Sequence, residues 1–579
     1  MRKKENKPIK IKQLEDDCRK VIVSEEYSDL LVNYERNITA TLIKYNAICY
    51  QIIDETYAIL HSPLENGPSL KELELFSTPN LYGPYGVSSL DASGILTFHE
   101  QPYLTLRGQG VIIGFVDSGI DYTHPTFIYE DNTTKILSIW DQTIQEGEPP
   151  LNFEYGTEYT SDMINEALDS ENPFDIVPSE DETGHGTFLA GTAAGRNVED
   201  ENFVGAAPDA EIIMVKLKGA KQYIRDIVMI NEDAVVYQNT DIMMGIKFLI
   251  EKAAVYDRPL VICIGLGTNI GDHAGAMPLE VYLEKTSDVF GRVVVVAAGN
   301  EANLGHHYLG EYTEELTYQD VELRVAPNER GVTMFLWART PDIYSIAILS
   351  PGGEFISRLS PRIGEREELQ LLLEQTQLYV QYELFDIRTG DEFVIIRLEA
   401  PSEGIWTLRV YGDVVVKGEY NIWIDREGWI QPETRFLDPS PFTTVTIPST
   451  NRVPITVGAY DHLTDSLFIG SGRGWTRYDK IKPEIVAPGV DVFGPLPNNR
   501  YGSMSGTSVS AAHVAGASAL LLEWGIVLGN NEKLDTRSIK KIIIRGANRK
   551  DDLTYPNREW GYGSLNLFNS FDILRGRKS

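Results

Sequence analysis

Three short segments each carry a residue type that nucleophilic catalysis requires: VDSGIDYTHP at 116–125, GHGTFLAGTAAG at 184–195 and GTSVSAAHVAG at 506–516. A serine hydroxyl is a weak nucleophile at neutral pH, so it needs an imidazole base within hydrogen-bond reach. The imidazole in turn needs a carboxylate that fixes its tautomer. The three segments supply one group of each kind, in Asp117, His185 and Ser508. We therefore predict a serine nucleophile activated by a His–Asp pair.

The residues around these groups suit the same chemistry. Glycines next to His185 and before Ser508 let the backbone come close to both groups and to a substrate. Ser508 begins an apolar, Ala-rich helix, whose dipole and free N–H groups would lie behind a developing oxyanion. Taken singly, each segment has a structural alternative: a turn aspartate, a tight turn with a structural histidine, or an ordinary N-cap. The combination in Asp–His–Ser order is far more specific.

The segments that must position these groups read as a parallel α/β sheet. From about residue 105, short apolar runs end in polar residues, as in GVIIGFVDSGID, EIIMVKLK, PLVICIGLG and RVVVVAAGN. Strands buried on both faces have this pattern, and here they alternate with helical stretches such as DIMMGIKFLIEKAAV. Functional residues of such sheets gather past the carboxyl ends of the strands, where Asp117 and Asn300 both fall.

Two further units are expected. Residues 1 to about 85 read as a small α+β unit: YSDLLVNYERNI has helical spacing, and ATLIKYNAICYQI and ETYAILHSP have the content of strands. A connector rich in Pro and Gly, STPNLYGPYGVSS, follows. Between about 310 and 445, alternating runs such as DEFVIIRLEAPSEGIWTLRVYG predict an antiparallel β-sandwich inserted into the α/β domain.

Composition limits the remaining possibilities. A chain of 579 residues should fold as two or three units, and its formal charge of −32 argues against a general nucleic-acid binder. No apolar run approaches the length of a membrane span, and no apolar stretch follows the basic N-terminus, so neither a span nor a signal peptide is expected. The three cysteines, Cys18, Cys49 and Cys263, fit neither a disulfide framework nor a zinc site and indicate a reducing, intracellular setting. Cys263 reads as a small core residue.

The three segments resemble the signatures of the subtilase family, D-[ST]-G-I, G-H-G-T-x-x-A-G and G-T-S-x-x-x-x-H-V-A-G, and the resemblance covers about 105–305 and 450–575. It implies the α/β fold class, with a subtilisin-like parallel sheet and flanking helices. To this core we add an N-terminal α+β prodomain and an inserted antiparallel, jelly-roll-like β-sandwich. The expected division is a prodomain at 1–85, a first catalytic part at 86–309, the insert at 310–445 and a second catalytic part at 446–579.

The resemblance also implies roles for single residues. The predicted catalytic residues are Asp117, His185 and Ser508. Asn300 in AAGNE matches the side-chain donor of the oxyanion hole, and IGLG resembles the substrate-binding edge strand, with Gly265, Leu266 and Gly267 as contacts. The reaction needs no cofactor, and no metal ligand set is found. Ala512 stands where the family usually has Pro, in a structural position.

A closer likeness is to clostridial Csp-type proteases. DSGIDYTHPTF, SIWDQTI, EYGTEYT and INEAL carry it, together with the β-rich insert. It implies a serine endopeptidase that activates a precursor of a spore cortex hydrolase, has no secretion signal, and is cytoplasmic or spore-associated. The expected partners are a protein or peptide substrate and the chain's own prodomain, bound in the active-site cleft.

Subtilase prodomains end in a strand that lies in this cleft as the first substrate. The equivalent segment here is NLYGPYGVSS at 80–89. Taking Tyr82 to Tyr85 as P4 to P1 puts an aromatic residue in each of two apolar pockets, so autoprocessing is predicted after Tyr85. The alternative is an ordinary Pro/Gly linker.

Two rival functions remain open: an inactive, regulatory subtilase-like protein, and a self-limited enzyme that cleaves only its own prodomain. The other candidates are given structural roles. Asp121 is expected to orient the turn of Asp117, His124 and His513 to be structural, and His273 with the pair His306–His307 to be loop residues.

Overall fold

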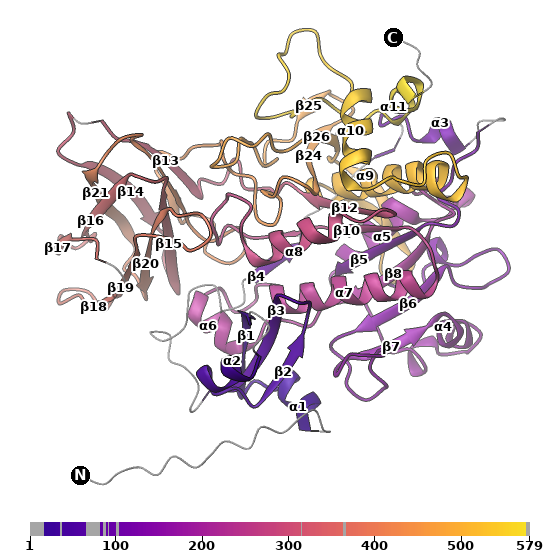
Figure 1. The fold of residues 1–579 in the computed structure, drawn as a ribbon, viewed down its shortest axis with the longest axis horizontal. Coiled ribbons are helices and arrows are strands. Elements are labelled where there is room, and N and C mark those ends of the chain that lie inside the picture. Colours follow the sequence, from indigo (N-terminus) through magenta and orange to yellow (C-terminus); the bar gives the residue numbers. More distant parts are fainter. Residues whose placement is uncertain are drawn as a thin grey trace.

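The computed structural model describes residues 17–34, 38–64, 81–84, 89–90, 92–99, 104–313, 315–362 and 366–574. A nine-stranded sheet runs through its centre, and the predicted apolar runs form the middle of this sheet (Figure 1). The parallel strands are β5 (Ile112–Asp117), β6 (Ile136–Asp141), β8 (Glu211–Lys216), β10 (Leu260–Ile264), β12 (Arg292–Ala297), β24 (Ile455–Asp461) and β26 (Ile485–Pro488). The order is β25-β24-β12-β10-β5-β8-β6-β7, with β26 on β24 and with antiparallel edges at β7 (Thr157–Thr160) and β25 (Ser466–Leu467).

Both faces of this sheet are buried. Along β12, Val293 and Val295 belong to one apolar core, while Val294 and Val296 belong to another. The first core contains α5 (His185–Ala194), α9 (Thr507–Leu522) and α10 (Thr536–Gly546), and the second contains α7 (Asn239–Val255) and α8 (Pro278–Ser287). The shorter helices are α3 (Leu96–His99), α4 (Ser161–Leu168), α6 (Gln222–Val228) and α11 (Leu567–Leu574). Burial on both faces explains why the strands read as continuous apolar runs.

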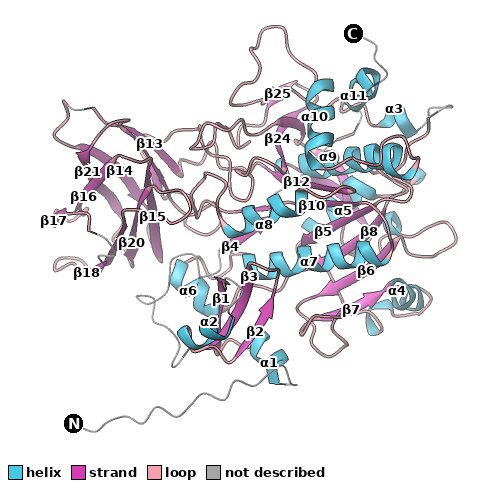
Figure 2. Cartoon of the chain, viewed as in Figure 1, coloured by secondary structure: helices cyan, strands magenta, loops and turns pink. Residues whose placement is uncertain are grey.

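An antiparallel β-sandwich interrupts the α/β domain and lies at one side of it (Figure 2), which confirms the predicted insert. One sheet has the order β13-β22-β15-β20-β19-β18, from β13 (His307–Glu311), β22 (Glu419–Trp423), β15 (Gly331–Ala338), β20 (Glu392–Glu399), β19 (Gln377–Glu383) and β18 (Arg366–Gln370). The other is β17-β16-β21-β14-β23, from β17 (Phe355–Leu359), β16 (Ile343–Leu349), β21 (Gly404–Val414), β14 (Gln319–Val325) and β23 (Arg435–Phe436). The two sheets enclose a core of their own. The segment boundaries 85, 309 and 445 stay a prediction.

Buried polar contacts join the sandwich to the α/β domain. Arg477 is completely buried and forms an ion pair with Asp391 of the insert at 2.7 Å. The ring of Trp423 stacks with the rings of His273 and His307, with centroids 4.0 and 4.7 Å away. The prediction that these histidines are loop residues holds for His273 but is wrong for His307, which belongs to β13.

The N-terminal unit has α1 (Asp17–Val23), α2 (Ile38–Lys44) and a sheet of order β1-β3-β2, built from β1 (Tyr27–Asn33), β2 (Cys49–Ile52) and β3 (Tyr57–Pro63). The predicted helix over YSDLLVNYERNI is wrong, because residues 27–33 form β1. The strand predicted over ATLIKYNAICYQI is right only at its end, where β2 lies, since its first residues belong to α2. Leu30 and Val32 face the core that contains α2, whereas Leu31 joins the core of the α/β domain. With both faces buried, β1 lacks the two-residue alternation that marks a strand.

Two cysteines form a disulfide, which corrects the prediction that the cysteines do not pair. Cys18 of α1 is bonded to Cys49 of β2, with their Cα atoms 5.9 Å apart. Their separation of 31 residues carries no signal in the sequence, since the pairing depends on α1 packing beside β2. Cys263 in β10 is a buried free thiol, as predicted.

A second, small sheet lies beside the α/β core. Strand β4 (Leu81–Pro84) pairs antiparallel with β11 (Leu266–Gly267) on one side and with β9 (Tyr237–Gln238) on the other. The hairpin of β27 (Val492–Leu496) and β28 (Arg500–Met504) precedes α9. The chain that leaves the N-terminal unit therefore runs along the segment predicted to bind substrate.

One helical stretch in the described part of the chain, Thr507–Val527, is long and apolar enough to cross a membrane. However, 89% of its most apolar window is buried inside the fold. It is the core helix α9 with its continuation.

Candidate active site

The structure brings Asp117, His185 and Ser508 into one hydrogen-bonded chain. His185 Nδ1 lies 2.7 Å from Asp117 Oδ1, and His185 Nε2 lies 3.2 Å from Ser508 Oγ. All three residues are buried. Segments separated by 68 and 323 residues thus place a carboxylate, an imidazole and a hydroxyl in the order that serine catalysis requires.

Each of the three groups stands at the end of an element. Asp117 is the last residue of β5, His185 is the first of α5 and Ser508 is the second of α9. Gly184 precedes His185 with φ +78°, a left-handed conformation that glycine adopts without strain. The next glycine is fixed by close approach, since a Cβ on Gly186 would lie 2.1 Å from the carbonyl oxygen of Gly119. The glycines of GHGT therefore allow α5, the helix that begins with His185 (the His helix), to pack against the turn that follows Asp117 (the Asp turn).

Asn300 lies beside the start of α9. Its Oδ1 accepts hydrogen bonds from both the backbone N–H and the hydroxyl of Thr507, each at 3.1 Å. These contacts orient the amide so that its NH₂ group is left to donate elsewhere. The N–H of Ser508, in the first turn of α9, has no partner within the helix. The N–H of Ser508 and the amide of Asn300, which is bound to the neighbouring Thr507, are thus two donors of the kind that binds an oxyanion.

The predicted substrate edge runs beside the same groups. A Cβ placed on Gly265 would lie 2.9 Å from Ser508 Cβ and 3.1 Å from His185 Cε1. Strand β11 continues from there, and its Leu266 and Gly267 pair with Pro84 and Gly83 of β4. Tyr85, the predicted processing site, lies outside the described residues.

Sequence reasoning missed Asp181, which ties the Asp turn to the His helix. Its Oδ1 accepts hydrogen bonds from Ser118 Oγ at 2.8 Å and from the N–H of Gly184 at 2.9 Å, and its Oδ2 accepts two from Thr187. Ser118 Oγ also accepts the N–H of Gly186. Asp181 lies three residues before Gly184, the N-cap of α5, so it does not stand at the position where a capping residue is recognised from sequence.

Replacing Asp181 with alanine is expected to lower both stability and turnover. The change leaves several buried donors without an acceptor, so we expect a loss of about 3–5 kcal/mol in the free energy of unfolding. Urea unfolding measures this loss, and the rate of peptide hydrolysis under folding conditions measures the effect on the His helix. An unfolding midpoint equal to that of the wild type would show that Asp181 does not hold the two segments together.

Other titratable groups near the site are held in neutral forms. Burial, and then the charge of Asp117, raise the pKa of Cys263 and of Tyr237 far above their ordinary values. Burial lowers the pKa of His513 to about 4, and its Nδ1 lies 2.8 Å from the carbonyl oxygen of Val509 in the preceding turn of α9. His513 is thus a structural residue of the helix.

The two remaining candidates near Asp117 also have structural contacts. His124 is buried, its Nδ1 accepts the N–H of Thr126, and its Nε2 lies 3.1 Å from the carbonyl oxygen of Arg500. Asp121 caps its own turn through Thr123 and accepts the N–H of Asn498 at 2.8 Å. Asp121 therefore fastens the hairpin loop of 497–499 to the Asp segment.

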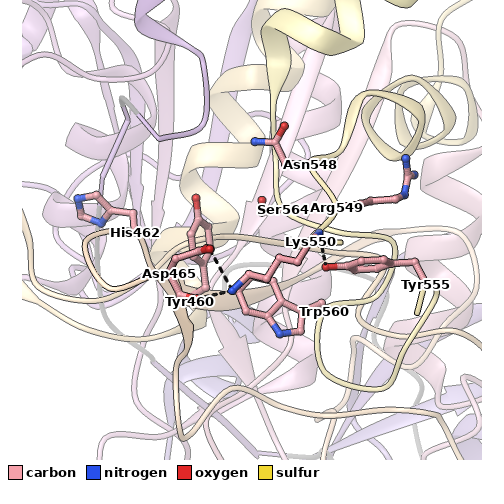
Figure 3. A pocket seen from close by; sticks show the side chains of 9 residues that line it. All are labelled: Tyr460, His462, Asp465, Asn548, Arg549, Lys550, Tyr555, Trp560 and Ser564. Atoms are coloured by element: carbon pink, nitrogen blue, oxygen red, sulfur yellow. Dashed lines mark hydrogen bonds and ion pairs between the residues drawn. The ribbon is translucent and has the colours of Figure 1, made fainter. Parts of the chain in front are cut away.

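A separate polar pocket of about 250 Å³ lies between the end of β24 and the C-terminal segment (Figure 3). Lys550 in this pocket lies 4.1 Å above the ring of Trp560 and forms an ion pair with Asp465 at 3.1 Å. None of Asp117, His185 and Ser508 lines it. Within the described residues, no group of three or more His, Cys, Asp or Glu side chains is arranged to hold a metal ion.

Fold and site together define the class of subtilisin-like serine peptidases. The model of the subtilase family matches residues 108–344 and 436–563, and the chain belongs to this family. The unmatched stretch between these two parts, 345–435, falls within the β-sandwich.

Among solved structures, the chain is similar to the CspB protease of Clostridium perfringens. The two are 32% identical, with a TM-score of 0.75, over 84% of this chain and 99% of that one. Among curated proteins it resembles the PII-type proteinase of Lacticaseibacillus paracasei, with 23% identity over 82% of this chain, and the C5a peptidase of Streptococcus pyogenes, with 22% over 82%. The matched region spans about a quarter of the length of this proteinase and 41% of the C5a peptidase.

Proposed function

We propose that the chain is a serine endopeptidase with Asp117, His185 and Ser508 as its catalytic triad. The observation that carries the proposal is the continuous hydrogen-bonded chain from Asp117 through His185 to Ser508. Membership of the subtilase family supports it.

The geometry suggests the role of each group. Ser508 Oγ attacks the carbonyl carbon of the scissile peptide bond while His185 Nε2 takes its proton. The N–H groups of Ser508 and Asn300 stabilise the resulting oxyanion. His185 then gives the proton to the leaving amine, and Asp117 stabilises the imidazolium that exists between the two transfers. A water molecule then attacks the acyl-enzyme by the same proton transfers through His185 and frees Ser508. No cofactor takes part.

Reaction with a fluorophosphonate probe tests the nucleophile directly. The probe should label the wild-type chain on Ser508, as located by peptide mass spectrometry, and should not label Ser508→Ala. Ser510 offers a matched control, because it is a buried serine on the same helix whose hydroxyl contacts the carbonyl oxygens of Ala487 and Pro488. Ser510→Ala should be labelled like the wild type. A wild-type chain that stays unlabelled even after the N-terminal unit is removed would favour the inactive, regulatory alternative.

Asn300→Ala is expected to lower turnover by about 10²–10³, the loss that removal of such a donor causes in subtilisin itself. The Michaelis constant should change little, since the amide interacts with the oxyanion and not with the ground-state carbonyl. Steady-state hydrolysis of a chromogenic peptide measures both constants. An equal loss through the Michaelis constant alone would place Asn300 in substrate binding instead.

Strand β4 favours a second, related proposal, in which the N-terminal unit is a prodomain that occupies the cleft and is cut by the enzyme itself. Gly83 and Pro84 pair with the edge strand β11, and Gly265, the residue just before β11, lies beside Ser508. Cleavage after Tyr85 should then give a new N-terminus at Gly86 in the wild type and none in Ser508→Ala, as read by N-terminal sequencing. If labelling occurs only after the N-terminal unit is removed, the enzyme is self-limited.

For the physiological role, we propose activation of a spore cortex hydrolase precursor in a cytoplasmic or spore-associated setting. The likeness to the CspB protease supports the assignment. Incubation of the active chain with such a precursor should yield one defined cut, and failure to cut it would overturn this role without affecting the triad.

A further inference from the structure

A single aspartate of the N-terminal unit is buried in the contact with the α/β domain. Asp29 in β1 is only 2% exposed, although the side chain is charged. Its Oδ1 forms an ion pair with Lys221 Nζ at 2.7 Å, and its Oδ2 accepts a hydrogen bond from Gln238 Nε2 at 3.0 Å. Burial alone would raise the pKa of Asp29, but the charge of Lys221 and the close contact with His61 outweigh burial and lower this pKa far below its usual value. The carboxylate is therefore bound as an anion.

The backbone of the same residue is bound as well. The hydroxyl of Tyr223 accepts the N–H of Asp29 at 3.0 Å and donates to its carbonyl oxygen at 2.7 Å. Lys221 Nζ also reaches the carbonyl oxygen of Tyr27 at 3.2 Å. Three side chains of the α/β domain thus recognise both the carboxylate and the extended backbone of one strand residue.

The charges on the α/β side balance only when a carboxylate is present. Lys218 and Lys221 are both buried, and Lys218 forms an ion pair with Asp241 at 2.7 Å. Without Asp29, the site would hold two ammonium groups and one carboxylate, a net charge of +1. A buried charge that loses its partner is strongly unfavourable, so the site requires one anion. His61, on the N-terminal side, contacts Asp29 Oδ1 at 2.6 Å and accepts from the Gln51 amide through its other nitrogen, which identifies it as a neutral donor.

This site lies next to the cleft. Gln238 belongs to β9, the strand that pairs with Leu81 and Tyr82 of β4. A polypeptide that lies in the cleft in the same way as β4 would therefore have Lys221, Tyr223 and Gln238 near its N-terminal part. An ion pair at the periphery of the N-terminal unit is, by contrast, exposed to solvent. Lys285 pairs with Asp54 at 3.2 Å, and the side chain of Lys285 is 45% exposed.

We propose that Lys221, Tyr223 and Gln238 form a carboxylate-binding exosite for one acidic residue on an extended strand, filled here by Asp29 and open to other acidic strands once the N-terminal unit leaves. The inference rests on the proposed function only for the release of that unit. The exosite itself is a property of the folded chain and can be tested without proteolysis.

The test uses the full chain with Ser508→Ala, so that no cleavage occurs. Asp29→Ala should speed hydrogen exchange at the backbone amides of β1 and β9 by about 10²-fold, because Lys221 loses its partner. Sodium formate fits the space that the deleted carboxylate leaves, and it should restore the protection. Sodium chloride at the same ionic strength should not. Equal effects of the two salts, or exchange unchanged by Asp29→Ala, would overturn the proposal.

Two lysine variants separate the exosite from a general electrostatic contact. Lys221→Met should speed exchange as Asp29→Ala does but should not respond to formate, because the receptor itself is gone. Lys285→Met, the matched control at the exposed pair, should change exchange little. Formate rescue of Lys221→Met, or an equal effect of Lys285→Met, would contradict the assignment.

A third variant guards against a failure of Asp29→Ala to fold. Asp29→Asn keeps the shape of the side chain but cannot neutralise Lys221. It should also speed exchange, and formate should leave it unchanged because the place is filled. Exchange as slow as in the chain with Asp29 would show that the site recognises shape and not charge.

Discussion

Ser508→Ala is expected to lower the turnover of peptide hydrolysis by about 10⁶, the loss found when the nucleophile of subtilisin is removed. The reason is that the hydroxyl of Ser508 lies 3.2 Å from His185 Nε2, the nitrogen that would take its proton. The fold should remain intact, since the change removes one oxygen atom from the first turn of α9. Single-turnover hydrolysis of an activated ester, followed with an excess of enzyme, measures the residual rate.

The control for this experiment is the folded state of the variant. Circular dichroism and the thermal midpoint of Ser508→Ala should match those of the wild type, so that lost activity reports chemistry and not unfolding. A residual rate within about tenfold of the wild type would assign the nucleophile to another residue, because a triad that loses its serine keeps only what binding and the oxyanion hole supply.

Asp117→Asn should lower turnover by about 10⁴ with little effect on substrate affinity. Asp117 Oδ1 accepts both the N–H of Ser118 at 2.8 Å and the proton of His185 Nδ1. An amide NH₂ in its place would donate to Nδ1 and force the ring proton onto Nε2, which then cannot accept a proton from Ser508. Steady-state kinetics against pH measures the loss.

Asp121→Asn provides the matched control for Asp117→Asn. Asp121 is a buried aspartate four residues further along, and its carboxylate contacts Thr123 and Asn498 instead of His185. It should keep turnover within about tenfold of the wild type. If both variants lose activity equally, the loss at Asp117 reflects the folding of this loop and not the tautomer of His185.

The sequence predicted those parts of the site that lie in short motifs. Asp117, His185 and Ser508 each stand in a segment with its own glycines, and apolar runs on both sides mark the elements that carry them. The hydrogen bonds at His185 agree with the order of groups that these motifs imply.

Contacts between distant segments could not be predicted in the same way. Asp181 reads as one acidic residue among several in SEDETG, and its role appears only when the Asp turn and the His helix meet. The bond between Cys18 and Cys49 and the strand at 27–33 depend likewise on packing between elements. Because β1 packs against two cores, its sequence lacks the two-residue alternation of apolar and polar residues from which a strand is predicted.

Every residue of helix α9, from Thr507 to Leu522, is buried. Ser508, the proposed nucleophile, therefore stands on a helix that is enclosed along its whole length, and the position of its backbone depends on the surrounding core. Heat should then inactivate the enzyme in one step with loss of the core, so that the half-life of activity equals the half-life of the native state. This has a consequence for self-digestion. Partly unfolded molecules should be inactive, so that only fully native molecules digest the unfolded ones.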